Sequence, residues 1–273
     1  MSGFLDDMAA RSAARVAQAL RHESLRVLER RARQAPPGAP LRLSSTGFDV
    51  IAELKLRSPA AGPLGDAGQD WQGRVAAYAR GGAAAVSVLT EPTRFDGSLE
   101  HLRLAAAVLG PLGVPAMRKD FLVDPYQVLE ARAAGAGGVL VILRMLPRAR
   151  IVELLDAAAE HGMFVLLEAF DEADLAMARD LTAPDREQSI LVGVNCRDLQ
   201  TLGVVQERFA ALAPLLPAGR PSVAESGVAS GADARRMQEL GYRVALIGTA
   251  LMAREDPSQL LHEIFEATRT VQR

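Results

Sequence analysis

Val50 to Pro59 reads VIAELKLRSP, a short apolar run typical of a buried β-strand, yet Glu53 and Lys55 stand in its middle. Side chains two residues apart on a strand point to the same face. At a rise of about 3.3 Å per residue, the two Cα atoms are expected roughly 6.6 Å apart. A carboxylate and an amine on one face of an apolar strand indicate that this face opens into a polar pocket, with Ile51 continuing the same row below it.

Apolar runs of this kind recur along the chain, and helical patterns lie between them. The runs are residues 48–56, 83–89, 114–121, 137–143, 163–170, 190–196, 221–227 and 244–250. The helical patterns are residues 71–82, 99–110, 124–135, 149–162, 171–181, 204–216, 231–241 and 257–271. Buried strands alternating with helices predict a parallel sheet covered by helices. Eight repeats favour a closed (β/α)8 TIM barrel over an open doubly wound sheet.

The expected helices carry plausible end signals. Acidic residues that precede helical stretches, and glycines that follow them, are typical caps. They are Asp124, Asp171, Gly110, Gly135, Gly162 and Gly241.

Residues 1–45 differ in character from the rest. One arginine-rich amphipathic helix is expected at about residues 4–33, followed by the Pro/Gly break APPGAP at 35–40. Seven arginines against four acids before residue 36 favour a solvated helix that covers one end of the barrel over a membrane-surface role. We expect one domain overall, with an N-terminal helical extension at 1–45 and the barrel at 46–273.

Composition narrows the class of protein. A net charge of −2 lacks the strongly basic face of a nucleic-acid binder, and no apolar run approaches about 20 residues, so neither nucleic acid nor membrane is an expected partner. The N-terminus lacks the pattern of a secretory signal, and the single Cys196 excludes an internal disulfide framework. We therefore expect a cytoplasmic protein.

Lysine is scarce in this chain. Of 31 basic residues, 29 are arginine, and only Lys55 and Lys119 are lysine. A charge that needs only solvation can be either type, whereas an amine in a confined site can exchange protons and a guanidinium cannot. The two lysines are therefore candidates for chemistry, although persistence on the surface by chance is the alternative.

Polar side chains gather late in the apolar runs, at the ends where barrels place their active sites. Besides Glu53 and Lys55 they are Lys119, Glu168, Asn195, Arg197, Glu225 and Ser226. Amines and carboxylates that converge in a water-poor mouth are suited to general acid and base catalysis. A set of internally satisfied ion pairs is the alternative interpretation.

Glycine turns follow the last two strands, where barrels commonly bind phosphate. Candidate phosphate ligands are Gly227, Gly248 and Thr249, with the hydroxyl of Ser58 from the first loop, although plain tight turns explain the glycines equally well. None of the four histidines stands at a strand end, so a histidine-based metal site is not expected. Cys196, next to Asn195, should point away from the barrel interior and serve packing.

Several stretches together resemble the indole-3-glycerol-phosphate synthase family, the tryptophan-pathway barrel. They are VIAELKLRSPAAG, SVLTEPTRFDGS, MRKDFLVDPYQVLEARAAGA, LLEAFDEADL, VGVNCRDLQTLGV, VAESGV and ALIGTALM, between about Phe48 and Pro257. The resemblance implies a carboxy-lyase that converts 1-(2-carboxyphenylamino)-1-deoxyribulose 5-phosphate to indole-3-glycerol phosphate without cofactor or metal.

The resemblance also implies roles. Lys119 would act as the general acid of ring closure, and Lys55 and Glu53 as acid and base of the later dehydration. The remaining implied ligands are Glu168 and Asn195 for positioning, Glu225 and Ser226 in the pocket wall, Arg197 for charge, Phe95, Phe121 and Leu199 around the aromatic ring, and Ser58, Gly227, Gly248 and Thr249 for phosphate.

Three other functions stay open from the sequence. The chain could be a paralogue that acts on a related aminodeoxyribulose phosphate, or a barrel enzyme in which Lys119 forms a Schiff base as in aldolases. It could also be a catalytically silent barrel that binds a phosphorylated ligand. A small phosphorylated molecule is the expected partner in each case, and the expected assembly is a monomer or a weak homodimer.

Overall fold

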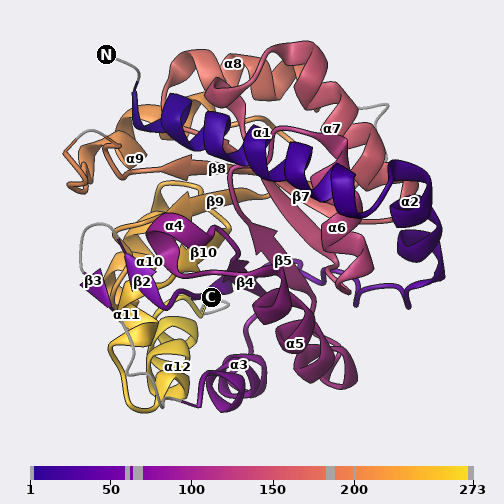
Figure 1. Ribbon diagram of the computed structural model, residues 1–273. Coiled ribbons are helices and arrows are strands. Elements are labelled where there is room, and N and C mark those ends of the chain that lie inside the picture. The colour runs from indigo at the N-terminus through magenta and orange to yellow at the C-terminus, as the bar shows by residue number, and fades with distance from the viewer. Residues whose placement is uncertain (1–2, 59–61, 64–69, 183–187, 200, 270–273) are drawn as a thin grey trace.

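Eight parallel strands close into a barrel in the computed structural model, which describes residues 3–58, 62–63, 70–182, 188–199 and 201–269 (Figure 1). Around the barrel, each strand pairs with the two that flank it, and the ring closes between β1 and β10. The strands are β1 (Asp49–Leu54), β4 (Ala85–Leu89), β5 (Ala116–Lys119), β6 (Gly138–Ile142), β7 (Phe164–Ala169), β8 (Ile190–Asn195), β9 (Ser222–Glu225) and β10 (Val244–Ile247). The predicted (β/α)8 barrel is confirmed, and each strand lies within a predicted apolar run.

Helices surround the barrel where the sequence predicts them. They are α3 (Trp71–Arg80), α5 (Leu99–Leu109), α6 (Pro125–Ala133), α7 (Arg148–Glu160), α8 (Glu172–Leu181), α9 (Glu207–Leu212), α10 (Gly231–Glu239) and α12 (Pro257–Ala267). Shorter elements not expected from the sequence are the helices α4 (Pro92–Phe95) and α11 (Thr249–Met252), the 3-10 turns η1 (Gly110–Leu112), η2 (Leu143–Met145) and η3 (Ala213–Leu215), and the antiparallel pair β2 (Arg57–Ser58) and β3 (Gly62–Pro63). Within the described ranges, no helix is both long and apolar enough to cross a membrane.

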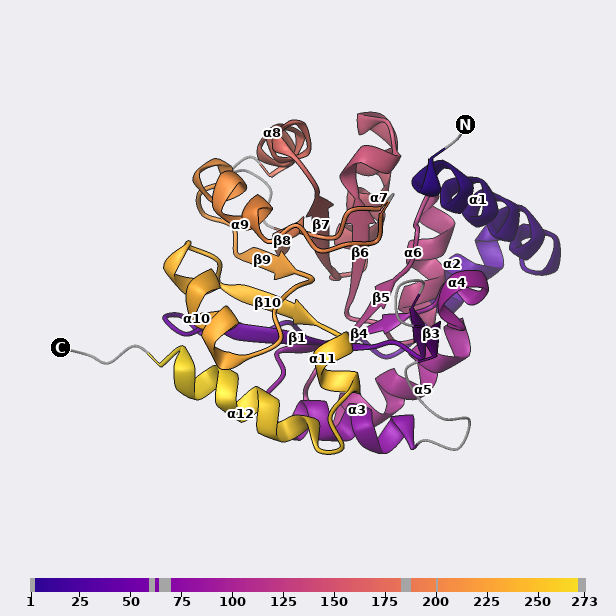
Figure 2. The same ribbon diagram turned by 90° about the vertical axis from the view of Figure 1, so that its left-hand side faces the viewer.

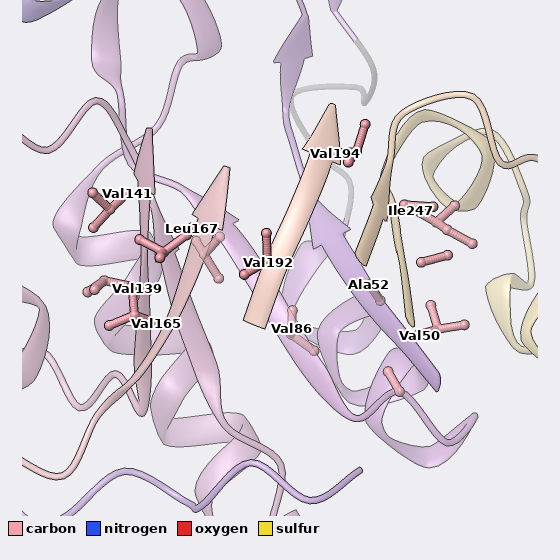
Figure 3. Packing of buried hydrophobic residues seen from close by; sticks show 14 of the residues in the cluster. Val50, Ala52, Val86, Val139, Val141, Val165, Leu167, Val192, Val194 and Ile247 are labelled. Atoms are coloured by element: carbon pink, nitrogen blue, oxygen red, sulfur yellow. The ribbon is translucent and has the colours of Figure 1, made fainter. Parts of the chain in front are cut away.

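The strands divide their side chains between two apolar layers. Residues such as Val50, Ala52 and Val192 belong to the large layer between strands and helices (Figure 3). The alternate positions, such as Ile51 and Leu166, fill the barrel interior. Because the period is two, the inner row of β1 continues from Ile51 through Glu53 to Lys55, as the opening stretch predicts.

The predicted helix caps are mostly confirmed. The side chains of Asp124 and Asp171 accept hydrogen bonds from backbone N–H groups of the first turns of α6 and α8. The glycines with positive φ behind α6, α7 and α10 are Gly135, Gly162 and Gly241. Gly110 is the C-cap of α5 as predicted, but its φ of −52° is helical and the chain runs on into η1. The left-handed stop lies instead at Gly113, with φ +71°.

The N-terminal segment forms two helices instead of the single predicted one, α1 (Phe4–His22) and α2 (Leu25–Gln34). Both lie on the α6 side of the barrel (Figures 1 and 2). Leu28 and Ala32 of α2 pack against Tyr126 of α6, and the Tyr126 hydroxyl donates to the carbonyl of Glu23 at 3.0 Å. The apolar face of α2 therefore turns toward α6, and this requires a break after His22 that helical periodicity does not reveal.

Candidate active site

A cavity of about 500 Å³ opens at the carboxyl ends of the barrel strands. The predicted site residues that line it are Glu53, Lys55, Phe95, Lys119, Phe121, Glu168, Asn195, Arg197, Leu199, Glu225, Ser226, Gly227, Gly248 and Thr249. The side chain of Ser58 lies outside the part of the chain that the structure describes. The structure thus brings the other fourteen together in one pocket, and their individual roles stay predictions.

Glu53 and Lys55 form a buried ion pair at the end of β1. The Lys55 ammonium lies 3.0 Å from Oε1 of Glu53, and both side chains are at most one-tenth exposed. Burial alone would raise the pKa of Glu53, but the nearby cations, chiefly Lys55 and then Lys119, lower it overall. Glu53 is therefore ionised at neutral pH.

Gly248 makes room for the Glu53 carboxylate. A Cβ atom at position 248 would lie 2.3 Å from Oε1 of Glu53, which is closer than real contacts allow. The sequence pattern indicates either a phosphate ligand or a plain tight turn at Gly248. Its missing side chain is already explained by the carboxylate beside it.

Lys119 is the centre of a second charge cluster, assembled from three strands. Its ammonium nitrogen lies 3.1 Å from Oε2 of Glu168 on β7 and 3.7 Å from Oε2 of Glu225 on β9. Burial alone would lower the pKa of Lys119, but the carboxylates of Glu168, Glu225 and Glu53 outweigh it and raise the pKa. Lys119 is therefore held as an ammonium ion whose side chain is 18% exposed toward the cavity.

Glu225 behaves differently from the other two carboxyl groups. It is buried, and neither of its oxygens has a hydrogen-bond partner among the described residues. Burial raises its pKa well above the usual range, and the negative charge of Glu168 raises it further. The raised pKa favours the protonated form of Glu225, and in that form the carboxyl group can donate a proton or a hydrogen bond.

Gly193 on β8 accommodates Glu225 as Gly248 accommodates Glu53. A Cβ atom at position 193 would lie 2.1 Å from Oε1 of Glu225 and 3.1 Å from Cδ1 of Leu166. Sequence reasoning missed Gly193. The inward row of β8, which runs Leu191, Gly193, Asn195, contained the signal, because a glycine in the middle of a strand often marks a close approach.

Asn195 ties the end of β8 to the turn after β9. Its Oδ1 accepts hydrogen bonds from the backbone N–H of Arg197 at 2.9 Å and from the hydroxyl of Ser226 at 3.0 Å. The amide is thus oriented with its NH2 group as the donor left for a ligand. The neighbouring Cys196 points into the outer apolar layer, where burial raises the pKa of its thiol to about 12, and the predicted packing role is confirmed.

An apolar wall closes the side of the pocket next to Lys119. Phe121 stands in it, with its ring centroid 6.2 Å from that of Phe95 and 5.8 Å from that of Phe4. Sequence reasoning missed four members of this wall: Phe4, Leu5, Leu140 and Ile142. Leu140 and Ile142 could have been found from the period of two on β6. Phe4 and Leu5 carried no signal, because only the packing of α1 brings them to the barrel mouth.

Comparison with known proteins identifies the family. The family model described as Indole-3-glycerol phosphate synthase matches residues 5–264, a wider span than the motifs between Phe48 and Pro257. A protein of that name from Parafrankia sp. (strain EAN1pec) is 41% identical over 249 residues, covering 90% of this chain and 89% of that protein. Another from Nocardioides sp. (strain ATCC BAA-499 / JS614) is 44% identical over 223 residues, covering 81% of this chain and 82% of that one.

Solved structures support the same fold. The crystal structure of 3-hexulose-6-phosphate synthase from Salmonella typhimurium matches with a TM-score of 0.60 and 13% identity, covering 81% of this chain and 98% of that one. At this identity the likeness shows the barrel alone. The family model matches nearly the whole chain, and relatives of that family are more than 40% identical to it. This chain therefore belongs to the indole-3-glycerol phosphate synthase family.

Proposed function

We propose that the protein converts 1-(2-carboxyphenylamino)-1-deoxyribulose 5-phosphate to indole-3-glycerol phosphate, carbon dioxide and water, as a carboxy-lyase of tryptophan biosynthesis. One observation carries the proposal beyond the family name: both lysines of the chain and three glutamates meet in one cavity, beside an apolar wall. Such a site fits a substrate that has an aromatic ring at one end, a phosphate at the other and a ketone between them.

Ring closure needs a proton donor at the ketone. As the ring carbon that bears the carboxylate attacks the carbonyl carbon, the oxygen gains a proton, and Lys119 supplies it. The neighbouring carboxylates keep Lys119 protonated before the reaction, so its ammonium group carries the proton that ring closure needs. Breakage of the bond to the carboxylate then releases carbon dioxide and restores the aromatic ring.

Dehydration needs an acid for the departing hydroxyl and a base for the proton lost from the ring system. Lys55 serves as the acid and Glu53 as the base, since they lie 3.0 Å apart and Glu53 is ionised. Glu168 keeps Lys119 charged, and the neutral Glu225 offers its proton as a hydrogen bond to the substrate. Water is the product of this step.

Binding follows the polarity of the pocket. Phe95, Phe121 and Leu199 enclose the aromatic ring, and Arg197 faces its carboxylate. Gly227, Gly248 and Thr249 take the phosphate at the other end, together with Ser58 and with Ser226 beside them. The chemistry calls for no redox cofactor, and we propose a cytoplasmic monomer or weak homodimer.

The electrostatics of the site argue against a Schiff base at Lys119. A nucleophilic amine must be deprotonated, and here the surrounding carboxylates raise the lysine pKa. Treatment with borohydride and substrate should therefore add no mass to Lys119. A silent phosphate-binding barrel is a poorer match as well, because simple binding does not require a buried Glu225 without a hydrogen-bond partner beside the Lys119 ammonium.

The decisive experiment supplies the purified protein with the carboxyphenylaminodeoxyribulose phosphate and follows product by indole fluorescence and by mass. We expect indole-3-glycerol phosphate and one carbon dioxide per turnover. The variant Lys119→Met serves as the control for contaminating enzyme. Substrate that remains intact with the wild-type protein would overturn the proposal, and turnover of a ring-substituted analogue alone would favour the paralogue.

A further inference from the structure

The turn after β9 has a backbone that needs external support. Ser226 and Gly227 follow one another with φ of 68° and 79°, both in the left-handed region. For a residue with a side chain this conformation is unfavourable, because Cβ crowds the neighbouring carbonyl oxygen. Three described residues other than glycine have a positive φ, and two of them, Leu202 and Ser226, belong to the loops after β8 and β9.

The loop after β8 folds back on itself and reaches this turn. The backbone N–H of Asp198 donates to the carbonyl of Gly203, and that of Val205 donates to the carbonyl of Cys196, both at 2.8 Å. The Arg197 guanidinium donates to the carbonyl of Leu202 at 2.8 Å. These bonds hold the returning arm of the loop, residues 203–206, beside the barrel mouth.

Gln206 is the last residue of this arm, and its side chain is hydrogen-bonded to the turn after β9. Its Nε2 donates to the carbonyl of Gly227 at 2.7 Å, and on the other side the Ser226 hydroxyl donates to Asn195. A Cβ atom at position 227 would lie 2.8 Å from Nε2 of Gln206 and 2.8 Å from Cγ1 of Val204. The contact is therefore close packed, and it requires glycine at 227.

We propose that Gln206 is a positioning residue for the phosphate end of the substrate. It is not among the residues that line the cavity, whereas Ser226 and Gly227 are. Its amide fixes the carbonyl of Gly227, and so fixes the peptide planes of a turn that would otherwise relax out of the left-handed region. The inference rests on the proposed function insofar as it assigns the phosphate to this turn.

The chemistry predicts a selective effect. Loss of the Gln206 donor leaves the reacting groups near Lys119 in place, because they lie on the barrel strands. Only the turn after β9 becomes less rigid, so the affinity for phosphate falls while the rate of the chemical step stays the same. One hydrogen bond of this kind corresponds to a change of roughly three- to tenfold in a binding constant.

The test compares Gln206→Met, which keeps the length of the side chain and removes the donor, with Gln206→Glu, which places an acceptor against the Gly227 carbonyl. The matched control is Gln238→Met. Gln238 makes the same kind of bond, from Nε2 to the carbonyl of Thr268 at 3.1 Å, and it does not line the cavity. Inorganic phosphate is titrated by calorimetry, and KM and kcat are measured with the substrate.

We expect Gln206→Met to weaken phosphate binding and raise KM by roughly three- to tenfold, with kcat within twofold of wild type, and Gln206→Glu to weaken both further. Gln238→Met should leave both quantities unchanged. Unaltered phosphate affinity in Gln206→Met, or an equal loss in Gln238→Met, would overturn the inference. If the wild-type protein lacked turnover, the proposed function would fail, and the phosphate titration would still decide the role of Gln206.

Discussion

The two lysines of this protein sit in ion pairs of different construction. Lys55, directly after the end of β1, pairs with Glu53 two residues before it on that strand, so the distance between them depends mainly on local chain geometry. Lys119 on β5 meets Glu168 on β7 and Glu225 on β9, so its environment exists only when the barrel has closed in the right register. A local pair survives small changes of packing, whereas the cluster from three strands is sensitive to each of its neighbours.

The difference extends to protonation. Glu53 has cations on more than one side and a lowered pKa. Glu225 shares a single lysine with Glu168, and burial together with that second carboxylate raises its pKa. Glu53 and Lys55 thus form a simple ion pair. Around Lys119, two carboxyl groups share one ammonium group. This asymmetry favours a protonated carboxyl group beside Lys119 in an otherwise charged pocket.

The largest expected effect comes from Lys119→Met. Methionine fills similar space but provides no proton, and it leaves Glu168 and Glu225 facing each other without a cation. We expect kcat to fall by roughly 10²- to 10⁴-fold, the range for loss of a general acid. Steady-state fluorescence assays at saturating substrate measure this. Wild-type turnover in the variant would remove Lys119 from the mechanism.

Lys55→Met should have a smaller effect and a distinct signature. If Lys55 acts in dehydration only, ring closure and release of carbon dioxide still proceed in the variant. Single-turnover experiments that follow carbon dioxide and indole separately should show carbon dioxide released faster than indole forms. Equal slowing of both products would place Lys55 earlier in the reaction and would make the two lysines functionally alike.

Gly193→Ala tests the close packing around Glu225. The added methyl group would overlap Oε1 of Glu225, so the carboxyl group must move away from its place beside Lys119. We expect kcat to fall about tenfold, as for a modest misplacement of a catalytic group. Gly110→Ala is the matched control, because a Cβ atom there meets nothing within 4 Å and its φ is helical.

A shorter acid should relieve the clash at position 193. In a Glu225→Asp background, Gly193→Ala is expected to cost less than it does in the wild-type protein. Independent, multiplicative losses in the double variant would show that the glycine acts elsewhere, for example on the neighbouring Leu166.

The smallest effects are on stability and have opposite signs for the two carboxyl groups. Because the folded-state pKa of Glu225 is raised, the unfolded chain loses this proton first, and stability falls as pH rises above the ordinary value of 4.5. Glu225→Gln removes that loss, so the variant should gain Tm relative to wild type between pH 5 and neutrality. Thermal unfolding over this pH range measures the difference.

Glu53 should show the reverse. Its folded-state pKa is lowered, so its contribution is fully present above pH 4.5 and is lost as pH falls through the folded value. Glu53→Gln should therefore lower Tm at neutral pH, with the deficit shrinking in acid. Curves of the same sign for Glu53→Gln and Glu225→Gln would contradict the different protonation states assigned to them.

Sequence patterns predicted the barrel strands and the residues on their inner faces, because these features depend on residues that are close together in the sequence. The period of two placed Glu53 and Lys55 together on the inner face, and the eight apolar runs predicted the barrel strands. The same reasoning did not reveal the proline-containing 3-10 turn that continues from Gly110, or the break after His22, where tertiary packing on α6 decides the direction of the chain.

The sequence by itself determined the barrel, the polar ends of its strands and the singular status of two lysines, since each is a property of spacing or composition. Only the tertiary structure decided which carboxyl groups meet around Lys119, why Gly193 and Gly248 lack side chains, how Phe4 reaches the pocket and how Gln206 reaches the turn after β9. Those features depend on distances between segments far apart in the chain. Such distances are set by register and by packed helices, and periodicity carries no record of them.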